Sequence, residues 1–392
     1  MILNRLKKVS KEIELMLLCS TMEIDEQDLD RITNLSAQDI DWHFFKTIII
    51  QNRVHLIVYK NLKLIKEYIP ENLSSELKEL TILTGARNLL FTFFLQNFVN
   101  IFNKHNIFIL PFKGPALAEQ LYNDIVFRSF SDLDILVDKN DALKAFKLLK
   151  EMGLTAQLDL SHSQFKKYIS NEDHFSFYDS KNKITVELHW EISGLYLSNP
   201  LTLSKLRKHI IAGRVANTEI PYLSPEVLLV YLCIHGSKHG WEYLEQLCCV
   251  AELIKLNPDL DWEKIKKFSA DWKCKRMVSL GLFLAAVLLK APVPQAAYGL
   301  KSDVNIIKKL AAKVADNLFI KRKDKGISDR FSFFHIQIRD SFIDKTRYGF
   351  RLIFRPTDKE WLYYPVPSYL AFVHYALRPF RLLFFKLRER HA

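Results

Sequence analysis

The sequence predicts an α+β fold in which a small mixed sheet with flanking helices is embedded in a mainly helical chain. Polar and apolar residues alternate in short runs within 108–137 and 174–190, which is typical of half-buried strands. Elsewhere apolar residues recur at spacings of three and four, which indicates amphipathic helices. The 392 residues, of which 49% are hydrophobic, suffice for two or three domains with a sizeable core.

Four consecutive segments are expected along the chain. Aliphatic and aromatic stripes predict a helical domain over 1–105, and the strand-like runs predict a domain with a sheet over 106–220. A second helical domain is expected over 221–320, followed by a basic, aromatic-rich region over 321–392. Within these segments we expect helices over 5–20, 42–59, 73–104, 115–122, 139–152, 225–256, 262–290 and 303–320.

Two aspartates lie one residue apart in the first strand-like stretch. Because strand side chains point to alternate faces, Asp132 and Asp134 emerge on one side, while Leu133 and Ile135 face the packed side. Two carboxylates held this close repel each other unless a cation lies between them, and Mg²⁺ is the usual cation where phosphates are also bound. The pattern therefore predicts a metal-dependent phosphate site that needs a third ligand.

The second stretch offers that ligand. Residues 174–178 and 184–190 flank a polar turn, which predicts a hairpin of two strands. Glu187 and His189 share one face of the second strand, opposite Val186. If the hairpin neighbours the strand of the aspartates, sheet pairing brings Glu187 toward them.

A glycine turn precedes the aspartates. Lys113 and Gly114 end the first strand-like run, and Pro115 suits the first turn of a helix. Glycine allows backbone amides to approach a phosphate closely, and a helix N-terminus adds positive potential. This turn is therefore a candidate phosphate site beside the predicted metal.

Together these features resemble the nucleotidyltransferase fold of the DNA polymerase beta superfamily. More narrowly, the chain resembles bacterial uncharacterised nucleotidyltransferase family proteins, which are often found near lasso-peptide or surface-polysaccharide biosynthesis genes. The resemblance covers roughly residues 10–260. The positions that carry it are Lys113, Gly114, Arg128, Asp132, Asp134, Glu187, His189 and Trp190.

The resemblance implies that residues 106–220 form the nucleotidyltransferase catalytic domain, and it implies roles for these positions. Asp132 and Asp134 would be the first two ligands of Mg²⁺ or Mn²⁺, and Glu187 would be the third carboxylate. Gly114 would open the nucleotide-binding turn, although the family's usual Gly-Gly or Gly-Ser pair is Gly-Pro here. The remaining positions Lys113, Arg128 and His189 would contact the nucleoside triphosphate (NTP).

Two histidines lie four residues apart in the helix expected over 225–256. The spacing places His235 and His239 on one helix face, which suits Zn²⁺, but the glutamate of an HExxH motif is missing and no third ligand is evident nearby. The resemblance extends to this His-Gly-x-x-His-x-Trp segment and implies that both histidines and Lys238 face the nucleotide or the acceptor. A structural role is the alternative.

The implied reaction transfers a nucleoside monophosphate from an NTP, ATP among them, to an acceptor hydroxyl or phosphate, in natural-product or surface-polysaccharide biosynthesis. The alternative is a noncatalytic scaffold that keeps the fold and binds a membrane surface or a biosynthetic partner. A third interpretation, an RNA nucleotide adder, requires aromatic and basic residues near the site, but nine of the twelve excess positive charges lie in residues 321–392. Nucleic acid is therefore not the expected partner.

The C-terminal region combines aromatic and basic residues. Arg378, Pro379 and Arg381 interrupt it too often for a membrane span, so a helix resting on anionic lipid, a helix docked on the core and a partner-protein site stay open. Five cysteines without a CxxC spacing indicate buried free thiols in a reducing compartment, and residues 1–8 do not resemble a signal peptide. A cytoplasmic protein, with an option of peripheral membrane contact, is expected.

Overall fold

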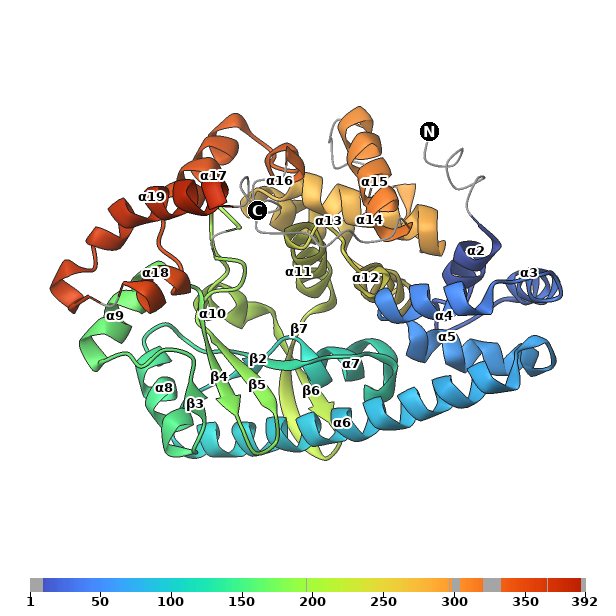
Figure 1. Ribbon diagram of the computed structural model, residues 1–392, viewed down its shortest axis with the longest axis horizontal. Coiled ribbons are helices and arrows are strands. Elements are labelled where there is room, and N and C mark those ends of the chain that lie inside the picture. Colours follow the sequence, from blue (N-terminus) through green and yellow to red (C-terminus); the bar gives the residue numbers. More distant parts are fainter. Residues whose placement is uncertain are drawn as a thin grey trace. The chain divides into compact units, whose positions relative to one another are not determined.

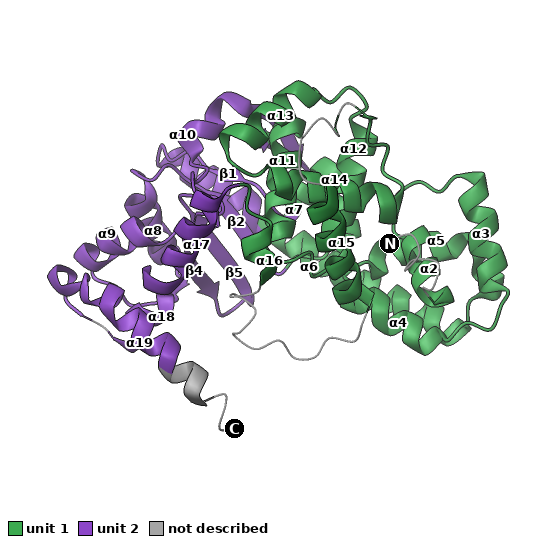
Figure 2. Ribbon diagram, turned by 90° about the horizontal axis from the view of Figure 1, so that it is seen from above, with its two compact units in different colours: residues 1–93, 115–130, 223–340 green, residues 94–114, 131–222, 341–392 purple. Residues whose placement is uncertain are grey.

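The computed structural model describes residues 10–194, 196–295, 297, 304–319, 333–364 and 366–388, and the predicted α+β class is confirmed (Figure 1). The chain forms two compact units, each assembled from separate stretches of sequence (Figure 2). The first comprises residues 1–93, 115–130 and 223–340, and the second comprises residues 94–114, 131–222 and 341–392. The division into four consecutive segments stays a prediction.

The first unit is helical. Its core is built around α11 (Pro225–Lys238), which packs against α12 (Leu244–Leu256), α13 (Trp262–Asp271) and α14 (Lys275–Leu289). Its other helices are α2 (Lys11–Leu18), α3 (Glu26–Ser36), α4 (Trp42–Gln51), α5 (His55–Leu62), η1 (Lys63–Tyr68), α7 (Gly114–Tyr122, from its second residue), η2 (Ile125–Phe127), α15 (Val304–Phe319) and α16 (Phe333–Gln337). The long helix predicted over 73–104 is confirmed as α6 (Glu71–Lys104), which contributes residues to both units.

The second unit contains a five-stranded mixed sheet of order β1-β2-β5-β4-β3. Its strands are β1 (Leu110–Pro111), β2 (Asp132–Leu136), β3 (Thr155–Ala156), β4 (His174–Asp179) and β5 (Ile184–His189). The predicted hairpin is confirmed as β4 and β5, and β5 runs parallel to β2 while the other neighbours pair antiparallel. A separate two-stranded sheet consists of β6 (Ile210–Val215) and β7 (Thr218–Leu223).

The apolar face of the five-stranded sheet is packed with aromatic rings. Phe146 of α8 (Ala142–Glu151) lies 4.0 Å from Phe165 of α9 (His162–Asn171), measured between ring centroids. The same ring lies 5.3 Å from Phe175 and 5.4 Å from Phe177 of β4. These contacts bury one face of the sheet and leave the polar side chains of the strands on the other face.

The remaining helices of the second unit are short or follow residue 341. They are α10 (Leu203–Leu206), η3 (Arg207–His209), α17 (Phe342–Phe354), α18 (Asp358–Tyr363), η6 (Ser368–Leu370) and α19 (Val373–Arg388). No helix within the described residues is long and apolar enough to cross a bilayer. Residues 5–9 of the first predicted helix, and residues 321–332, 365 and 389–392 of the predicted C-terminal region, lie outside the described residues.

Three helices predicted as continuous are wrong. The helix over 42–59 is two helices, α4 and α5, because Arg53 adopts a left-handed conformation with φ of 58°. The helix over 225–256 is likewise divided into α11 and α12, where Gly240 and Trp241 have φ of 62° and 55°. The second break turns the Trp241 ring into the core, where it is fully buried. The helix over 262–290 is divided into α13 and α14, where Lys273 has φ of 56°. The prediction of buried free thiols is confirmed for all five cysteines.

Candidate metal and nucleotide site

Three neighbouring strands gather polar side chains on one face of the sheet. The register places Asp134 of β2 directly opposite Glu187 of β5, and His189 of β5 opposite His174 of β4. Paired residues on adjacent strands point to the same face. The predicted delivery of Glu187 to the aspartate strand is therefore confirmed, and it follows from the parallel pairing of β2 with β5.

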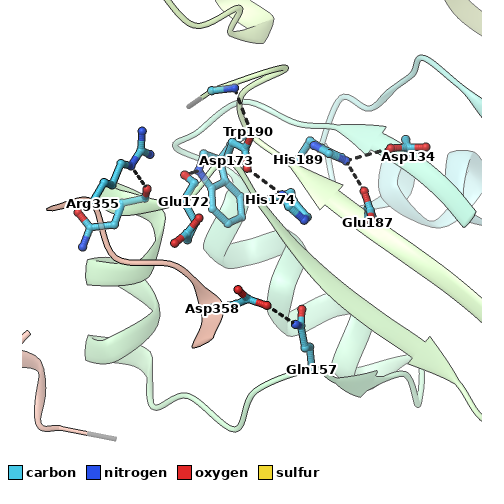
Figure 3. Close-up of polar contacts among 12 residues, drawn as sticks. Asp134, Gln157, Glu172, Asp173, His174, Glu187, His189, Trp190, Arg355 and Asp358 are labelled. Carbon is cyan, nitrogen blue, oxygen red and sulfur yellow. Dashed lines mark hydrogen bonds and ion pairs between the residues drawn. The ribbon is translucent and has the colours of Figure 1, made fainter. Parts of the chain in front are cut away.

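A cluster of two carboxylates and one imidazole forms at this point (Figure 3). The Nε2 atom of His189 lies 3.1 Å from Asp134 Oδ1 and 3.1 Å from Glu187 Oε2. Asp134 Oδ1 also accepts a hydrogen bond of 2.8 Å from Lys113 Nζ. One ligand atom from each of Asp134, Glu187 and His189 lies within 4.8 Å of the other two, which is close enough for all three to hold one metal ion.

Both carboxylates of the cluster are held in the charged form. Burial raises the pKa of Asp134, but the charge of Lys113 and the hydrogen bond from His189 outweigh it, so the pKa is lowered. Burial likewise raises the pKa of Glu187, the hydrogen bond with His189 lowers it, and the net shift is downward. The cluster therefore presents two ionised carboxylates at neutral pH.

The donor set fits a divalent cation. Asp134 is 2% exposed, and its Oδ2 atom has no hydrogen-bond partner among the described residues. A buried carboxylate oxygen without a partner is costly, and a cation bound there would remove that cost. Mg²⁺ prefers oxygen ligands, whereas Mn²⁺ accepts carboxylates and imidazole together, so both ions suit the cluster.

The other predicted ligand, Asp132, lies two residues earlier on the same face of β2 and is partly exposed. It does not belong to the group whose ligand atoms lie within 4.8 Å of one another. His189, which the resemblance assigned to the NTP, stands in that group instead. The alternation in 184–190 already placed His189 on the face of Glu187, but it did not show that the ring lies between two carboxylates.

The sequence did not predict that a further acid, Asp173, lies beside the cluster. Asp173 Oδ1 lies 2.8 Å from His174 Nδ1, and Asp173 Oδ2 accepts a hydrogen bond of 3.1 Å from the backbone N–H of Gly194. The His174 ring stacks on His189 with centroids 5.0 Å apart (Figure 3). Asp173 therefore orients His174, which in turn supports one side of His189. The Asp-His pair at the start of β4 was the available signal.

The glycine turn lies beside β2. Gly114 has φ of 57°, and a Cβ atom added to it would lie 3.4 Å from the backbone oxygen of Asp132. The backbone at Gly114 thus lies close to the strand that carries the aspartates. Left-handed geometry at this position explains why glycine stands there.

Gly114→Ala is expected to lower the free energy of unfolding by about 1 kcal/mol, because alanine is strained at positive φ. Gly153→Ala is the matched control, since Gly153 also has positive φ (88°) but no atom within 4 Å of an added Cβ. Urea denaturation should show a similar loss for both variants. Only Gly114→Ala should also weaken binding of an NTP, and equal NTP binding by the two variants would contradict a role for the turn.

Three residues that were predicted to contact the NTP or the acceptor belong to the first unit. Arg128 Nε lies 2.6 Å from Glu245 Oε1, and both side chains are buried, so the charge of Arg128 is compensated by Glu245. The rings of His235 and His239 lie 4.6 Å apart at the end of α11. No third metal ligand joins these two histidines in the part of the chain that the structure describes. Assignment of all three residues to the NTP or acceptor stays a prediction.

Comparison with known proteins identifies a family. The model of a family described as uncharacterised nucleotidyltransferase matches residues 38–290, which is more than half of the chain. No curated protein and no solved structure matches the chain. The matched range includes the glycine turn, the polar face of the sheet, His235 and His239. The chain therefore belongs to the uncharacterised nucleotidyltransferase family.

Proposed function

We propose that this chain transfers a nucleoside monophosphate from an NTP to an acceptor hydroxyl or phosphate. The observation that carries the proposal is the buried Asp134–Glu187–His189 cluster, with its unpartnered carboxylate oxygen, in a chain of a nucleotidyltransferase family. In the reaction an acceptor oxygen forms a bond to the α-phosphorus. The bond from that phosphorus to the oxygen bridging to the β-phosphate breaks, and pyrophosphate leaves with the electron pair.

Asp134, Glu187 and His189 would hold Mg²⁺ or Mn²⁺, with Asp132 beside them on the same face of the sheet. When bound, the cation neutralises phosphate charge and favours in-line attack. The side chain of Glu187 is 25% exposed and that of Asp134 is fully buried, so Glu187 is the carboxylate that an acceptor can reach. We assign to Glu187 the orientation of the acceptor and the acceptance of its proton.

Lys113 would change partner during the cycle. Its Nζ atom lies 2.8 Å from Asp134 Oδ1 and its side chain is 18% exposed, so the ammonium group stands at the edge of the cluster. A cation bound to Asp134 would repel it, and the leaving pyrophosphate would attract it. We therefore assign Lys113 to the β- and γ-phosphates, next to the backbone of Gly114.

Lys113→Met is expected to shift metal and NTP binding in opposite directions. Loss of the positive charge should raise the affinity for Mn²⁺ alone about tenfold and should lower the affinity for an NTP by a similar factor. Lys139→Met is the matched control, because Lys139 is half exposed and pairs with Glu191 rather than with the cluster. Calorimetric titration of both ligands into each variant measures this, and parallel changes in the two affinities would argue against the assignment.

We place this reaction in the cytoplasm, where NTPs are available and the five free cysteines would stay reduced. A noncatalytic scaffold is the weaker alternative. A buried and a partly buried carboxylate, both ionised and on one face, are costly to retain without a ligand, and a scaffold has no need of them.

The direct test uses labelled NTPs. The full chain is incubated with Mg²⁺, an extract of possible acceptors and one NTP labelled on either the α- or the γ-phosphate. The proposal predicts that label from the α-position enters the acceptor and that label from the γ-position leaves as pyrophosphate. Entry of the γ-label into the acceptor would indicate a kinase instead and would contradict the proposal.

A further inference from the structure

Helix α17 is attached to its own unit through polar side chains. Asp344 is buried and accepts a hydrogen bond from the Ser198 hydroxyl, and Arg351 Nη1 donates a hydrogen bond of 2.8 Å to the backbone oxygen of Leu197. Between them, the Tyr348 ring lies 6.0 Å from another tyrosine ring. Positions 344, 348 and 351 share one helix face, so the inner face of α17 is the polar one.

Helix α19 repeats this arrangement. His374 Nε2 lies 2.8 Å from the backbone oxygen of Tyr364, and Arg378 and Arg381 both bond to the carboxylate of Glu360 in α18. All three side chains are buried and again occupy one face at spacings of four and three. Arg378 and Arg381 of α19 therefore face inward.

The outward faces are apolar. We define the C-terminal apolar surface by the large apolar side chains of α17, α19 and the residue just before α19 that are more than 60% exposed: Phe342, Ile343, Phe350, Phe372, Phe380 and Leu383. A helix that meets water on its outer side carries polar residues there and apolar residues inside. These two helices do the reverse, so their outer sides are suited to an apolar environment.

Basic and acidic side chains of this region differ in their exposure to solvent. Of the three acidic residues within 341–383, Asp344 and Glu360 are buried, and Asp358 bonds to the amide of Gln157. The exposed Arg347 and the partly exposed Arg351 line a hollow of about 610 Å³ together with Phe350 and Thr346. Arg347 thus gives the outer side of α17 a positive charge.

We propose that the C-terminal apolar surface docks on an anionic lipid bilayer. Phenylalanine and tyrosine side chains partition into the headgroup layer, and arginine and lysine bind its phosphates. A uniformly anionic surface complements a face on which Arg347 is exposed and none of the described acidic side chains is, whereas a second copy of this chain would oppose like charges. The helices would lie along the bilayer, since none of those described can cross it. This inference does not depend on the proposed nucleotidyl transfer.

The test is co-sedimentation of the full chain with vesicles of phosphatidylcholine alone, or of phosphatidylcholine and phosphatidylglycerol in equal parts. We expect binding to the mixed vesicles, weakened by salt, and little binding to phosphatidylcholine alone. Phe342→Ser/Phe380→Ser should lower the partition coefficient at least about tenfold. Leu83→Ser/Leu89→Ser on α6, which alters side chains of similar exposure (59% and 62%), should leave it unchanged.

Each other outcome would overturn the inference. Equal binding to both vesicle types would remove the role of charge, and an equal loss in the two double variants would show that exposed apolar residues act without a specific surface. Absence of binding to either vesicle type would exclude a bilayer as the partner of this surface. In that case a dimer in sedimentation velocity that is lost in Phe342→Ser/Phe380→Ser would assign the surface to a second copy, and a monomer would assign it to another protein. Unchanged melting temperatures establish that the variants fold.

Discussion

Asp134→Asn is expected to lower kcat/KM for nucleotidyl transfer about 10³-fold or more, with the fold retained. Asp134 contributes the most buried carboxylate of the cluster, and one of its oxygens has no partner within the described residues. Asparagine keeps the volume of the side chain and can still accept the hydrogen bond from Lys113. The substitution thus removes the charge that would hold a cation without emptying the space around β2.

The control for this variant is Asp179→Asn in the same sheet. Asp179 Oδ1 accepts hydrogen bonds from the backbone N–H groups of Lys181 (2.9 Å) and Asn182 (3.0 Å) in the hairpin turn, and asparagine retains that acceptor. Activity of this variant should equal that of the wild type. A folded Asp134→Asn protein with wild-type turnover would show that the cluster is not the catalytic centre.

Glu360→Ala is expected to lower the free energy of unfolding by about 3–5 kcal/mol. Glu360 is fully buried, and its carboxylate bonds to Arg378, Arg381 and the Thr357 hydroxyl. Removal of the carboxylate leaves two buried guanidinium groups without a compensating charge. Urea denaturation, followed by far-UV circular dichroism, measures the loss.

The pH dependence gives an independent readout of the same carboxylate. Burial raises the pKa of Glu360, but hydrogen bonds from Thr357 and Arg381 outweigh it and lower the pKa. A lowered folded-state pKa means that the stabilisation is present above the unfolded pKa and is lost as the pH falls through the folded value. Wild type should therefore lose stability in acid, and Glu360→Ala should show less of this dependence.

The matched control replaces the whole ion-pair network by apolar residues. Glu360→Met/Arg378→Met/Arg381→Leu leaves no buried charge uncompensated and should recover much of the stability lost in Glu360→Ala. If the single and triple variants are equally unstable, packing rather than charge compensation explains the loss. If Glu360→Ala is as stable as the wild type, the inward-facing arginines do not depend on this carboxylate.

The polar face of the sheet could be predicted because it depends on local alternation. Period two fixed which residues of 132–135 and 184–190 share a face, and parallel pairing of β2 and β5 then placed Asp134 opposite Glu187. Which side chains meet depends also on their conformations. For that reason the sequence did not show that His189, rather than Asp132, joins the close group of ligand atoms.

The errors lie where tertiary contacts override local preference. Arg53 and Trp241 adopt left-handed conformations that no turn propensity of arginine or tryptophan predicts, and these conformations divide two predicted helices. Burial of the Trp241 ring beside Gly236 accounts for the second break. In the same way, the sequence does not predict that Arg378 and Arg381 form ion pairs with the buried Glu360 of α18.

The most direct test of the central claim is calorimetric titration of the four NTPs into wild type, Asp134→Asn and Asp179→Asn, each with and without Mg²⁺ or Mn²⁺. The cluster of Asp134, Glu187 and His189 predicts that one NTP binds wild type and Asp179→Asn only when the divalent cation is present, and that this binding disappears in Asp134→Asn. NTP binding that is independent of the cation, or that survives in a folded Asp134→Asn protein, would contradict a metal-dependent nucleotide site at this cluster.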